Sequence, residues 1–160
     1  MGLGWTKPDV VFMTEALGEA RQALRLGEVP VGAAVVLGGE VIAKAHNLCE
    51  TLQDPTAHAE MLAIRRAAGV VGSYRLLGAE LFVTVEPCVM CAGALHLARV
   101  RRVIYGCPDL KGGALGSCYQ IHADNRLNHH LEVRKGVLAD QCRELMRSFF
   151  SGLRASKSCP

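Results

Sequence analysis

The sequence has no apolar run long enough to cross a membrane. Its first residues also lack the charged segment followed by an apolar segment that marks a secretory leader. Both absences predict a cytoplasmic chain without a membrane partner, in which thiols stay reduced. The cysteine count of 7 agrees with this expectation, because a secreted disulfide framework uses cysteines in pairs.

Internal repeats, low-complexity tracts and linker-like segments are also missing from the sequence. A chain of 160 residues is long enough to bury one hydrophobic core. We therefore predict a single domain over residues 1–160, with loose termini at residues 1–5 and 155–160.

Strong charge of either sign is absent as well. The net charge of +3 is too small to indicate nucleic-acid binding by itself. Basic residues nevertheless outnumber acidic ones by seven to three from Arg126 onward, and a second basic cluster consists of Arg99, Arg101 and Arg102. Such clusters fit either a polyanionic partner or an ordinary solvated surface.

Hydrophobic periodicity predicts an α/β fold. Apolar residues at helical spacing predict helices over residues 9–26, 56–69, 88–98 and 137–150. Apolar, β-branched runs predict strands over residues 31–37, 40–45, 81–85, 103–105 and 131–133. Crossover helices require parallel strands, and the Gly38-Gly39 turn requires an antiparallel hairpin. We therefore expect a mixed five-stranded sheet with helices on both faces, a three-layer α/β/α arrangement.

Two short segments carry the residues expected to form a metal site. Residues 56–60 read Thr-Ala-His-Ala-Glu, and residues 86–91 read Glu-Pro-Cys-Val-Met-Cys. Zinc prefers histidine nitrogen and cysteine sulfur, and a catalytic zinc site uses three protein ligands. His58, Cys88 and Cys91 supply these three. The pairing of H-x-E with P-C-x-x-C is the signature of the zinc-dependent nucleobase deaminases.

The expected helices explain how these ligands meet. We place Cys88 and Cys91 on one face of the first turn of their helix, where the backbone N–H groups and the helix dipole favour thiolate. His58 is expected in the first turn of the preceding helix, and two such helix starts meet at one sheet edge when they follow neighbouring strands. Glu60 then lies near the metal but is poorly oriented to bind it, which suits a proton carrier.

A closed structural zinc site and a redox-active cysteine pair are the alternatives. A closed site needs a fourth Cys or His, and no other histidine has paired-ligand spacing with His58. A lone C-x-x-C is equally compatible with redox chemistry or with a core position. The proline before the first cysteine and the strand before each helix favour the open, catalytic site. The remaining cysteines are expected to be free: Cys49, Cys107, Cys118, Cys142 and Cys159.

Further segments extend the resemblance from about Thr14 to Arg154. They comprise residues 27–33, 46–47, 54–61, 74–76, 83–94, 111–114, 127–130 and 149–150. With them the sequence resembles the bacterial tRNA-specific adenosine deaminases, which convert adenosine to inosine at wobble position 34 of the anticodon. The resemblance implies a cytidine deaminase-like fold, a homodimer, one Zn²⁺ per subunit, and the anticodon stem-loop of a tRNA, namely arginine tRNA, as substrate.

The resemblance also implies roles for individual residues. Glu60 carries protons while adenine loses ammonia from C6, and Asn47 hydrogen-bonds the flipped-out base between pocket walls formed by Val31 and Ala57. Anticodon-loop contacts are expected from Asp109, Lys111, Asn128, His129 and Phe149. Ordinary structural roles remain open for all of these: a turn for the asparagine, the core for the apolar residues, and the solvated surface for the others.

Departures from the family weaken the expected grip on phosphate. Leu48 stands where the family often has Arg, and the C-terminal helix is less basic than in many members. The helix around residues 92–98 and the basic residues 99–102 are either a dimer interface or ordinary core and surface.

Two other function classes also remain open. A small-molecule deaminase acting on guanine, cytosine or a nucleoside shares the zinc site but lacks the anticodon contacts. A non-catalytic zinc module has no need of Glu60.

Overall fold

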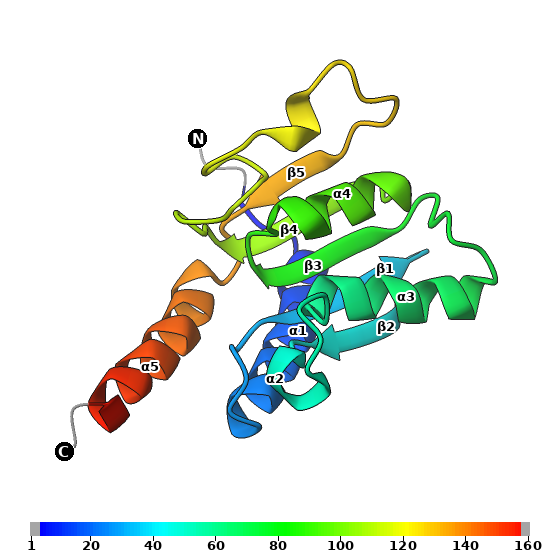
Figure 1. The fold of residues 1–160 in the computed structure, drawn as a ribbon. Helices are drawn as coiled ribbons and strands as arrows, with labels where there is room; N and C mark the ends of the chain where they lie inside the picture. Colours follow the sequence, from blue (N-terminus) through cyan, green and yellow to red (C-terminus); the bar gives the residue numbers. More distant parts are fainter. Residues whose placement is uncertain (1–3, 158–160) are drawn as a thin grey trace.

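A mixed five-stranded sheet forms the centre of the fold (Figure 1). The structure, a computed structural model, describes residues 4–157. The strands are β1 (Gly32–Leu37), β2 (Glu40–His46), β3 (Glu80–Val85), β4 (Arg102–Cys107) and β5 (Glu132–Lys135). They lie in the order β2-β1-β3-β4-β5, with β1 antiparallel to both of its neighbours and β3, β4 and β5 mutually parallel.

Helices cover both faces of this sheet. Helices α1 (Lys7–Arg25) and α5 (Ala139–Lys157) pack on one face, and α3 (Ala59–Val71) and α4 (Val89–Leu97) pack on the other. The predicted three-layer α/β/α arrangement is therefore confirmed. Among the described residues, no helix is both long and apolar enough to cross a membrane.

Strand alternation divides the core into two layers. In β1, Ala33 and Val35 join the cluster beneath α3 and α4, while Ala34 and Val36 join the cluster beneath α1 and α5. Side chains of successive strand residues point to opposite faces, so a strand that is buried on both faces reads as a continuous apolar run. This explains why these strands were recognisable in the sequence.

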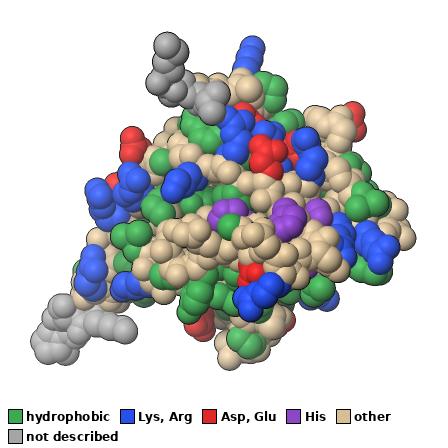
Figure 2. Space-filling model, turned by 90° about the horizontal axis from the view of Figure 1, so that it is seen from above, with side chains coloured by type: hydrophobic (Ala, Val, Ile, Leu, Met, Phe, Trp, Pro, Cys, Tyr) green, Lys and Arg blue, Asp and Glu red, His purple; other side chains and the backbone are tan. Residues whose placement is uncertain are grey.

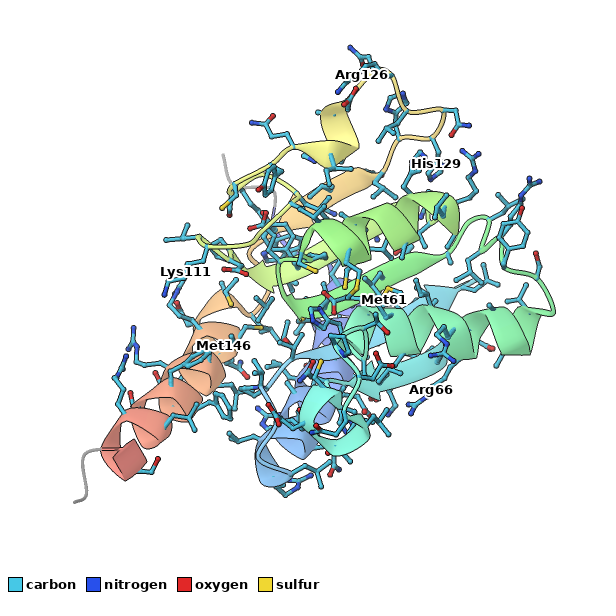
Figure 3. The ribbon with its side chains drawn as sticks, viewed as in Figure 1. Met61, Arg66, Lys111, Arg126, His129 and Met146 are labelled. Carbon is cyan, nitrogen blue, oxygen red and sulfur yellow. The ribbon has the colours of Figure 1, made fainter. Side chains whose placement is uncertain are left out.

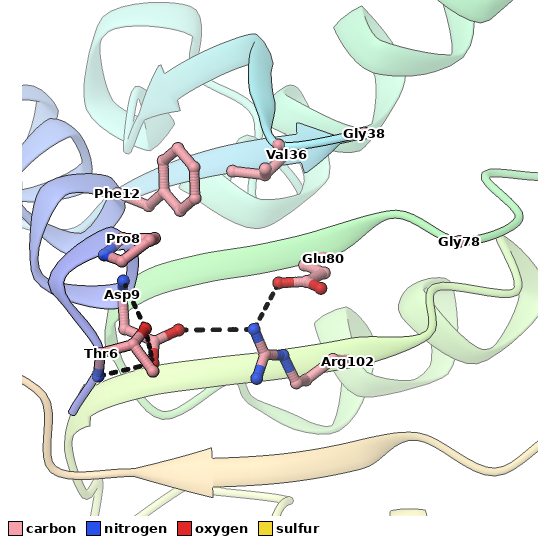
Figure 4. A pocket seen from close by; sticks show the side chains of 10 residues that line it. Thr6, Pro8, Asp9, Phe12, Val36, Gly38, Gly78, Glu80 and Arg102 are labelled. Carbon is pink, nitrogen blue, oxygen red and sulfur yellow. Dashed lines mark hydrogen bonds and ion pairs between the residues drawn. The ribbon is translucent and has the colours of Figure 1, made fainter. Parts of the chain in front are cut away.

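Helix α1 begins at a complete capping box. The Thr6 hydroxyl accepts from the Asp9 N–H at 3.2 Å, and the Asp9 carboxylate accepts from the Thr6 N–H at 3.2 Å. Beside this start lies a hollow of about 200 Å³, in which Arg102 pairs with Asp9 at 3.4 Å and with Glu80 at 2.6 Å (Figure 4). The charged groups at this hollow neutralise one another, and it lies away from the expected metal ligands.

Several boundaries differ from those expected. The predicted polar loop after β2 contains the short helix α2 (Cys49–Leu52), and the unassigned 117–130 stretch contains a 3₁₀ turn, η1 (Ile121–Ala123). Such short elements bury too little of one face to leave a periodic pattern.

The termini differ as well. Helix α5 continues through residues 155–157, which were expected to be loose. No glycine or proline interrupts the sequence from Leu153 to Lys157. Trp5 is half-buried, since Arg134 lies 4.8 Å above its ring. Residues 1–3 and 158–160 of the expected loose termini, including Cys159, lie outside the described residues.

Candidate metal centre and substrate cavity

One edge of the sheet collects the functional segments. Because β1 is antiparallel to both β2 and β3, the carboxyl ends of β2, β3 and β4 all lie at the edge where β1 begins. The chain leaving β2 leads to His58, the chain leaving β3 leads to Cys88, and the chain leaving β4 forms the 108–118 loop. In open α/β sheets this edge is the usual place for ligands.

The three expected metal ligands meet at this edge. The Nδ1 atom of His58 lies 3.6 Å from the Sγ atom of Cys88 and 3.6 Å from the Sγ atom of Cys91. All donor atoms of the group lie within 4.8 Å of one another, and no other group of three potential metal donors occurs in the described part of the chain. The N-terminal ends of α3 and α4 therefore supply one cluster of donor atoms.

The local backbone differs slightly from the expectation. His58 and Cys88 are the N-cap residues of α3 and α4, with extended backbone conformations, and only Cys91 lies within the first turn. An N-cap residue projects from the helix end rather than from its side, so the two caps can face each other across the gap between the helices. The helix dipoles and exposed N–H groups still point at this cluster.

The spacing of the donors fits zinc. Tetrahedral coordination with Zn–S near 2.3 Å and Zn–N near 2.05 Å places a sulfur and a nitrogen ligand about 3.6 Å apart. The observed nitrogen–sulfur distances are both 3.6 Å. Three donors of this kind leave one tetrahedral position open, which is the pattern of a catalytic zinc site.

The two thiols respond strongly to each other. Hydrogen bonds from Cys91 and then His58 lower the pKa of Cys88 to about 4, so this sulfur is a thiolate at neutral pH. The hydrogen bond with Cys88, followed by burial, raises the pKa of the Cys91 thiol. Zinc binding requires both sulfurs as thiolates, so a divalent cation between them would favour loss of the Cys91 proton.

Glu60 lies beside the donor cluster but outside it. The residue is only 4% exposed, and burial raises the pKa of its carboxyl to about 7. A carboxyl with a pKa near neutrality can both take up and give back a proton at physiological pH.

A cavity of about 1020 Å³ opens over the cluster. Its lining includes the expected site residues His58, Glu60, Cys88, Asn47, Val31, Asp109 and Lys111. Helix α5 contributes the opposite wall through Arg143, Met146, Arg147, Phe150, Leu153 and Arg154. Figure 3 shows Lys111 and Met146 on the same side of the molecule, where α5 leaves the sheet. This volume is large enough for a nucleoside and part of its neighbours.

Backbone hydrogen bonds bring the expected base-pocket residues together. The Asn47 N–H donates to the Val31 carbonyl at 3.1 Å, and the Leu48 N–H donates to the Ala57 carbonyl at 3.0 Å. Ala57 is 1% exposed and supports the cavity from behind rather than lining it. The segments before β1, after β2 and before α3 therefore form one floor next to His58.

The loop after β4 is held by a buried carboxylate that sequence reasoning missed. Glu86 is 3% exposed and accepts from the N–H groups of Asp109, Leu115 and Ser117 at 3.0 to 3.1 Å. A Cβ at Gly113 would collide with this carboxyl group. Glu86 thus fixes the loop that carries Asp109 and Lys111 at the cavity. In the sequence, only its position directly before Pro87 and Cys88 could have drawn attention to it.

Three expected anticodon-loop contacts lie outside the cavity lining. The Asn128 side chain accepts from Arg99 at 2.9 Å, and the His129 ring lies 2.7 Å from the Val100 carbonyl. Both side chains therefore pack against the turn that follows α4. Figure 3 shows His129 and Arg126 at the end of the molecule away from Lys111. Phe149 is half-buried against Phe150, and it is Phe150 that lines the cavity. Helical rotation between neighbouring residues decides which phenylalanine faces the cavity, and the sequence did not reveal it.

Comparison with known proteins decides the family. Residues 6–107 match the model of the cytidine and deoxycytidylate deaminase zinc-binding region. The chain belongs to this deaminase family. The match spans the donor cluster and Glu60, and together with the donor spacing it identifies the cofactor as one zinc ion per chain.

Relatives within this deaminase family confirm the resemblance seen in the sequence. The chain is 49% identical over 149 residues to a tRNA-specific adenosine deaminase of Bacillus subtilis, covering 93% of this chain and 92% of that protein. A solved structure from studies of A-to-I editing by tRNA:A34 deaminases has a TM-score of 0.82 and 45% identity, covering 84% of this chain and 98% of that one.

A guanine deaminase of Bacillus subtilis is less similar, with 29% identity and a TM-score of 0.60, covering 91% of this chain and 92% of that one. These matches also confirm the expected cytidine deaminase-like fold.

Proposed function

We propose that this chain is a zinc-dependent hydrolase that converts adenosine to inosine at wobble position 34 of a tRNA and releases ammonia. The observation that carries the reaction type is the buried Glu60 beside the His58, Cys88 and Cys91 cluster at the base of the cavity. The substrate is supported by the tRNA-specific adenosine deaminases that share 44% to 49% of its residues over most of their length.

The cluster would hold the zinc ion, which supplies Lewis acidity and lowers the pKa of water. Glu60 takes a proton and returns it to the substrate, since its buried carboxyl has a pKa near neutrality. Asn47 holds the base by hydrogen bonds at the cavity wall, with Val31 as an apolar wall and Ala57 supporting that wall from behind. The buried floor excludes water from all but the open side of the base.

The RNA is held at the cavity mouth. Asp109 and Lys111 come from the 108–118 loop, and Arg143 and Arg147 come from α5, so basic side chains from two elements face one opening. Figure 2 shows Lys and Arg side chains at several places on the face seen from above, some of them beside acidic side chains. Phe150 offers a ring on which a base can stack, in the place expected for Phe149. Asn128 and His129 remain proposed contacts to the anticodon loop, made outside the cavity lining.

Incubation of the zinc-loaded protein with an anticodon stem-loop that has adenosine at position 34 is expected to yield inosine and ammonia. Free adenosine, cytidine and guanine are expected to react at least about 100 times more slowly, because they cannot use the loop and α5 contacts that contribute binding energy. Nucleoside composition after digestion and ammonia release give the two measurements.

A stem-loop with guanosine at position 34 is the control for non-specific ammonia release. Deamination of a free base or nucleoside without reaction of the stem-loop would instead assign the chain to the small-molecule deaminases. Within tRNA substrates, we propose arginine tRNA as the species used and the cytoplasm as the place of reaction, on the strength of the family resemblance.

We also propose a homodimer through the outward face of α4. Ala92, Leu95 and Ala98 are buried in the core, so only part of the small-residue helix is available to a partner. Val89 and Leu97 are 48% and 69% exposed on the other side. Large apolar side chains exposed in a stripe are typical of an interaction surface.

Leu97→Glu is expected to convert the dimer to a monomer, because a buried charge without a partner costs several kcal/mol. Light scattering after size exclusion measures the mass. Leu77→Glu is the matched control, since Leu77 is 68% exposed on the loop before β3. A dimer that survives Leu97→Glu, or one that Leu77→Glu also dissociates, would contradict the α4 assignment.

A further inference from the structure

The two carboxylate oxygens of Glu86 hold different parts of the loop that follows β4. The Oε1 atom accepts from the Leu115 and Ser117 N–H groups, both at 3.0 Å, and so binds the later part of the loop. The Oε2 atom accepts from the Ser117 hydroxyl and from the Asp109 N–H, the latter at 3.1 Å. Donors therefore face both oxygens, which suits a carboxylate, whereas an amide can accept at only one of its two ends.

Asp109 extends this hold to Lys111. The Asp109 Oδ1 atom accepts from the Lys111 N–H at 2.9 Å, and the Asp109 carbonyl accepts from the Gly113 N–H at 2.9 Å. An aspartate side chain that accepts from the N–H two residues ahead closes an Asx turn, which fixes the backbone between the two residues. The direction in which Lys111 leaves the loop therefore depends on where Glu86 holds Asp109.

Lys111 is the cation that these contacts place at the cavity mouth. It lines the cavity and is exposed. On the opposite wall, Arg143 pairs with Asp140 and Arg147 pairs with Glu144. In the described part of the chain, no carboxylate forms an ion pair with the Lys111 ammonium. A lysine whose charge is not neutralised by a neighbour is suited to bind a phosphate, the repeating anion of a nucleic acid.

We propose that Glu86 is a positioning residue for RNA binding, which acts through Asp109 to hold the Lys111 ammonium against a backbone phosphate of the anticodon loop. Glu86 itself does not reach the RNA, because it is 3% exposed and the backbone at Gly113 packs against its carboxyl group. This inference rests on the proposed function, since it takes the tRNA anticodon loop as the ligand of the cavity mouth.

The test measures the binding of a fluorescent adenosine-34 stem-loop to zinc-loaded protein at several salt concentrations. All samples carry Glu60→Gln, so that the stem-loop is bound but not consumed. Each phosphate that a cation neutralises on a single strand adds about 0.7 to the slope of log affinity against log salt concentration. Lys111→Ala is therefore expected to weaken binding about 10-fold and to lower this slope by about 0.7.

Glu86→Gln is expected to reproduce both changes. The glutamine oxygen is expected to face the Leu115 and Ser117 N–H groups, because the opposite orientation would leave both of these donors unpaired. Its NH₂ group then faces the Asp109 N–H, and a donor facing a donor releases Asp109 together with Lys111. In a Lys111→Ala background, Glu86→Gln is expected to change affinity and slope no further.

Ser117→Ala is the matched control. It removes the hydroxyl bond to Oε2 but leaves the three N–H bonds to Glu86, so it is expected to lower the melting temperature and leave the slope unchanged. Zinc content is measured in every variant, because Glu86 lies two residues before Cys88 in the chain. Glu86→Gln is expected to retain zinc.

If Glu86→Gln does not fold, Asp109→Ala replaces it and breaks the next bond, from the Lys111 N–H to Oδ1. Removal of a negative charge beside RNA would by itself strengthen binding. Release of Lys111 is instead expected to weaken binding and to lower the salt slope by about 0.7.

An unchanged salt slope in folded Glu86→Gln, or in Asp109→Ala where that variant replaces it, would overturn the inference. So would a fall in slope that recurs in full in the Lys111→Ala background, or one that accompanies loss of zinc. A purely structural role would lower the melting temperature and the active fraction without altering the slope. If the wild-type protein does not deaminate the adenosine-34 stem-loop at all, the proposed function fails first, and the two failures are distinguishable.

Discussion

Glu60→Gln is expected to retain zinc and lose turnover by about 100- to 10,000-fold, the usual contribution of a positioned acid–base group. The amide has the same shape as the carboxylate but cannot accept and return a proton. Glu60 lies outside the donor group, so the substitution leaves all three ligands in place. Single-turnover deamination of the adenosine-34 stem-loop measures the rate, and metal analysis measures the zinc content.

Glu40→Gln is the control for this experiment, because Glu40 is exposed on the β1–β2 hairpin and is expected to retain the wild-type rate. Loss of zinc in Glu60→Gln would mean that the carboxylate binds the metal. A rate within a few-fold of wild type, with zinc retained, would remove Glu60 from proton transfer.

Cys88→Ala is expected to lose stoichiometric zinc and to destabilise the fold. Zinc binding contributes about 4 kcal/mol to folding at a free zinc concentration about 1000 times the dissociation constant. For a domain of this size that is about 10 °C in melting temperature. The loss of stability is expected at the N-terminal ends of α3 and α4, which His58, Cys88 and Cys91 bring together.

The comparison needs two references. Cys118→Ala removes an exposed thiol that donates to the Leu110 carbonyl, and it is expected to keep zinc and most of its stability. Wild-type protein treated with a chelator is expected to melt at about the temperature of Cys88→Ala, since both lack the same metal bonds. Stoichiometric zinc in Cys88→Ala would contradict the ligand assignment.

The sequence was informative wherever chemistry is local. His58 and Glu60 are two residues apart, and Cys88 and Cys91 are three apart, so their relation to a helix start was readable from the chain. The doubly buried strands and the amphipathic helices also leave direct patterns in the sequence. For these reasons the layers, the zinc cofactor and the reaction class were predictable before the structure was known.

Burial and long-range contacts were not readable in the same way. Glu28 and Glu86 look like ordinary acidic residues in the sequence, yet each is buried and holds a segment that carries expected substrate contacts. Their partners lie up to 31 residues away along the chain. Asn128 and His129 show the converse, because their neighbours on the turn after α4 place them outside the cavity.

The sequence by itself determined that residues 56–60 and 86–91 form a zinc deaminase site, because ligand type and spacing are set by bonds along the chain. Only the tertiary structure decided which other side chains surround that site. The strand order brings the ends of β2, β3 and β4 to one edge, and the course of α5 turns Phe150 rather than Phe149 toward the cavity. Contacts of this kind depend on where distant segments pack, which no local pattern records.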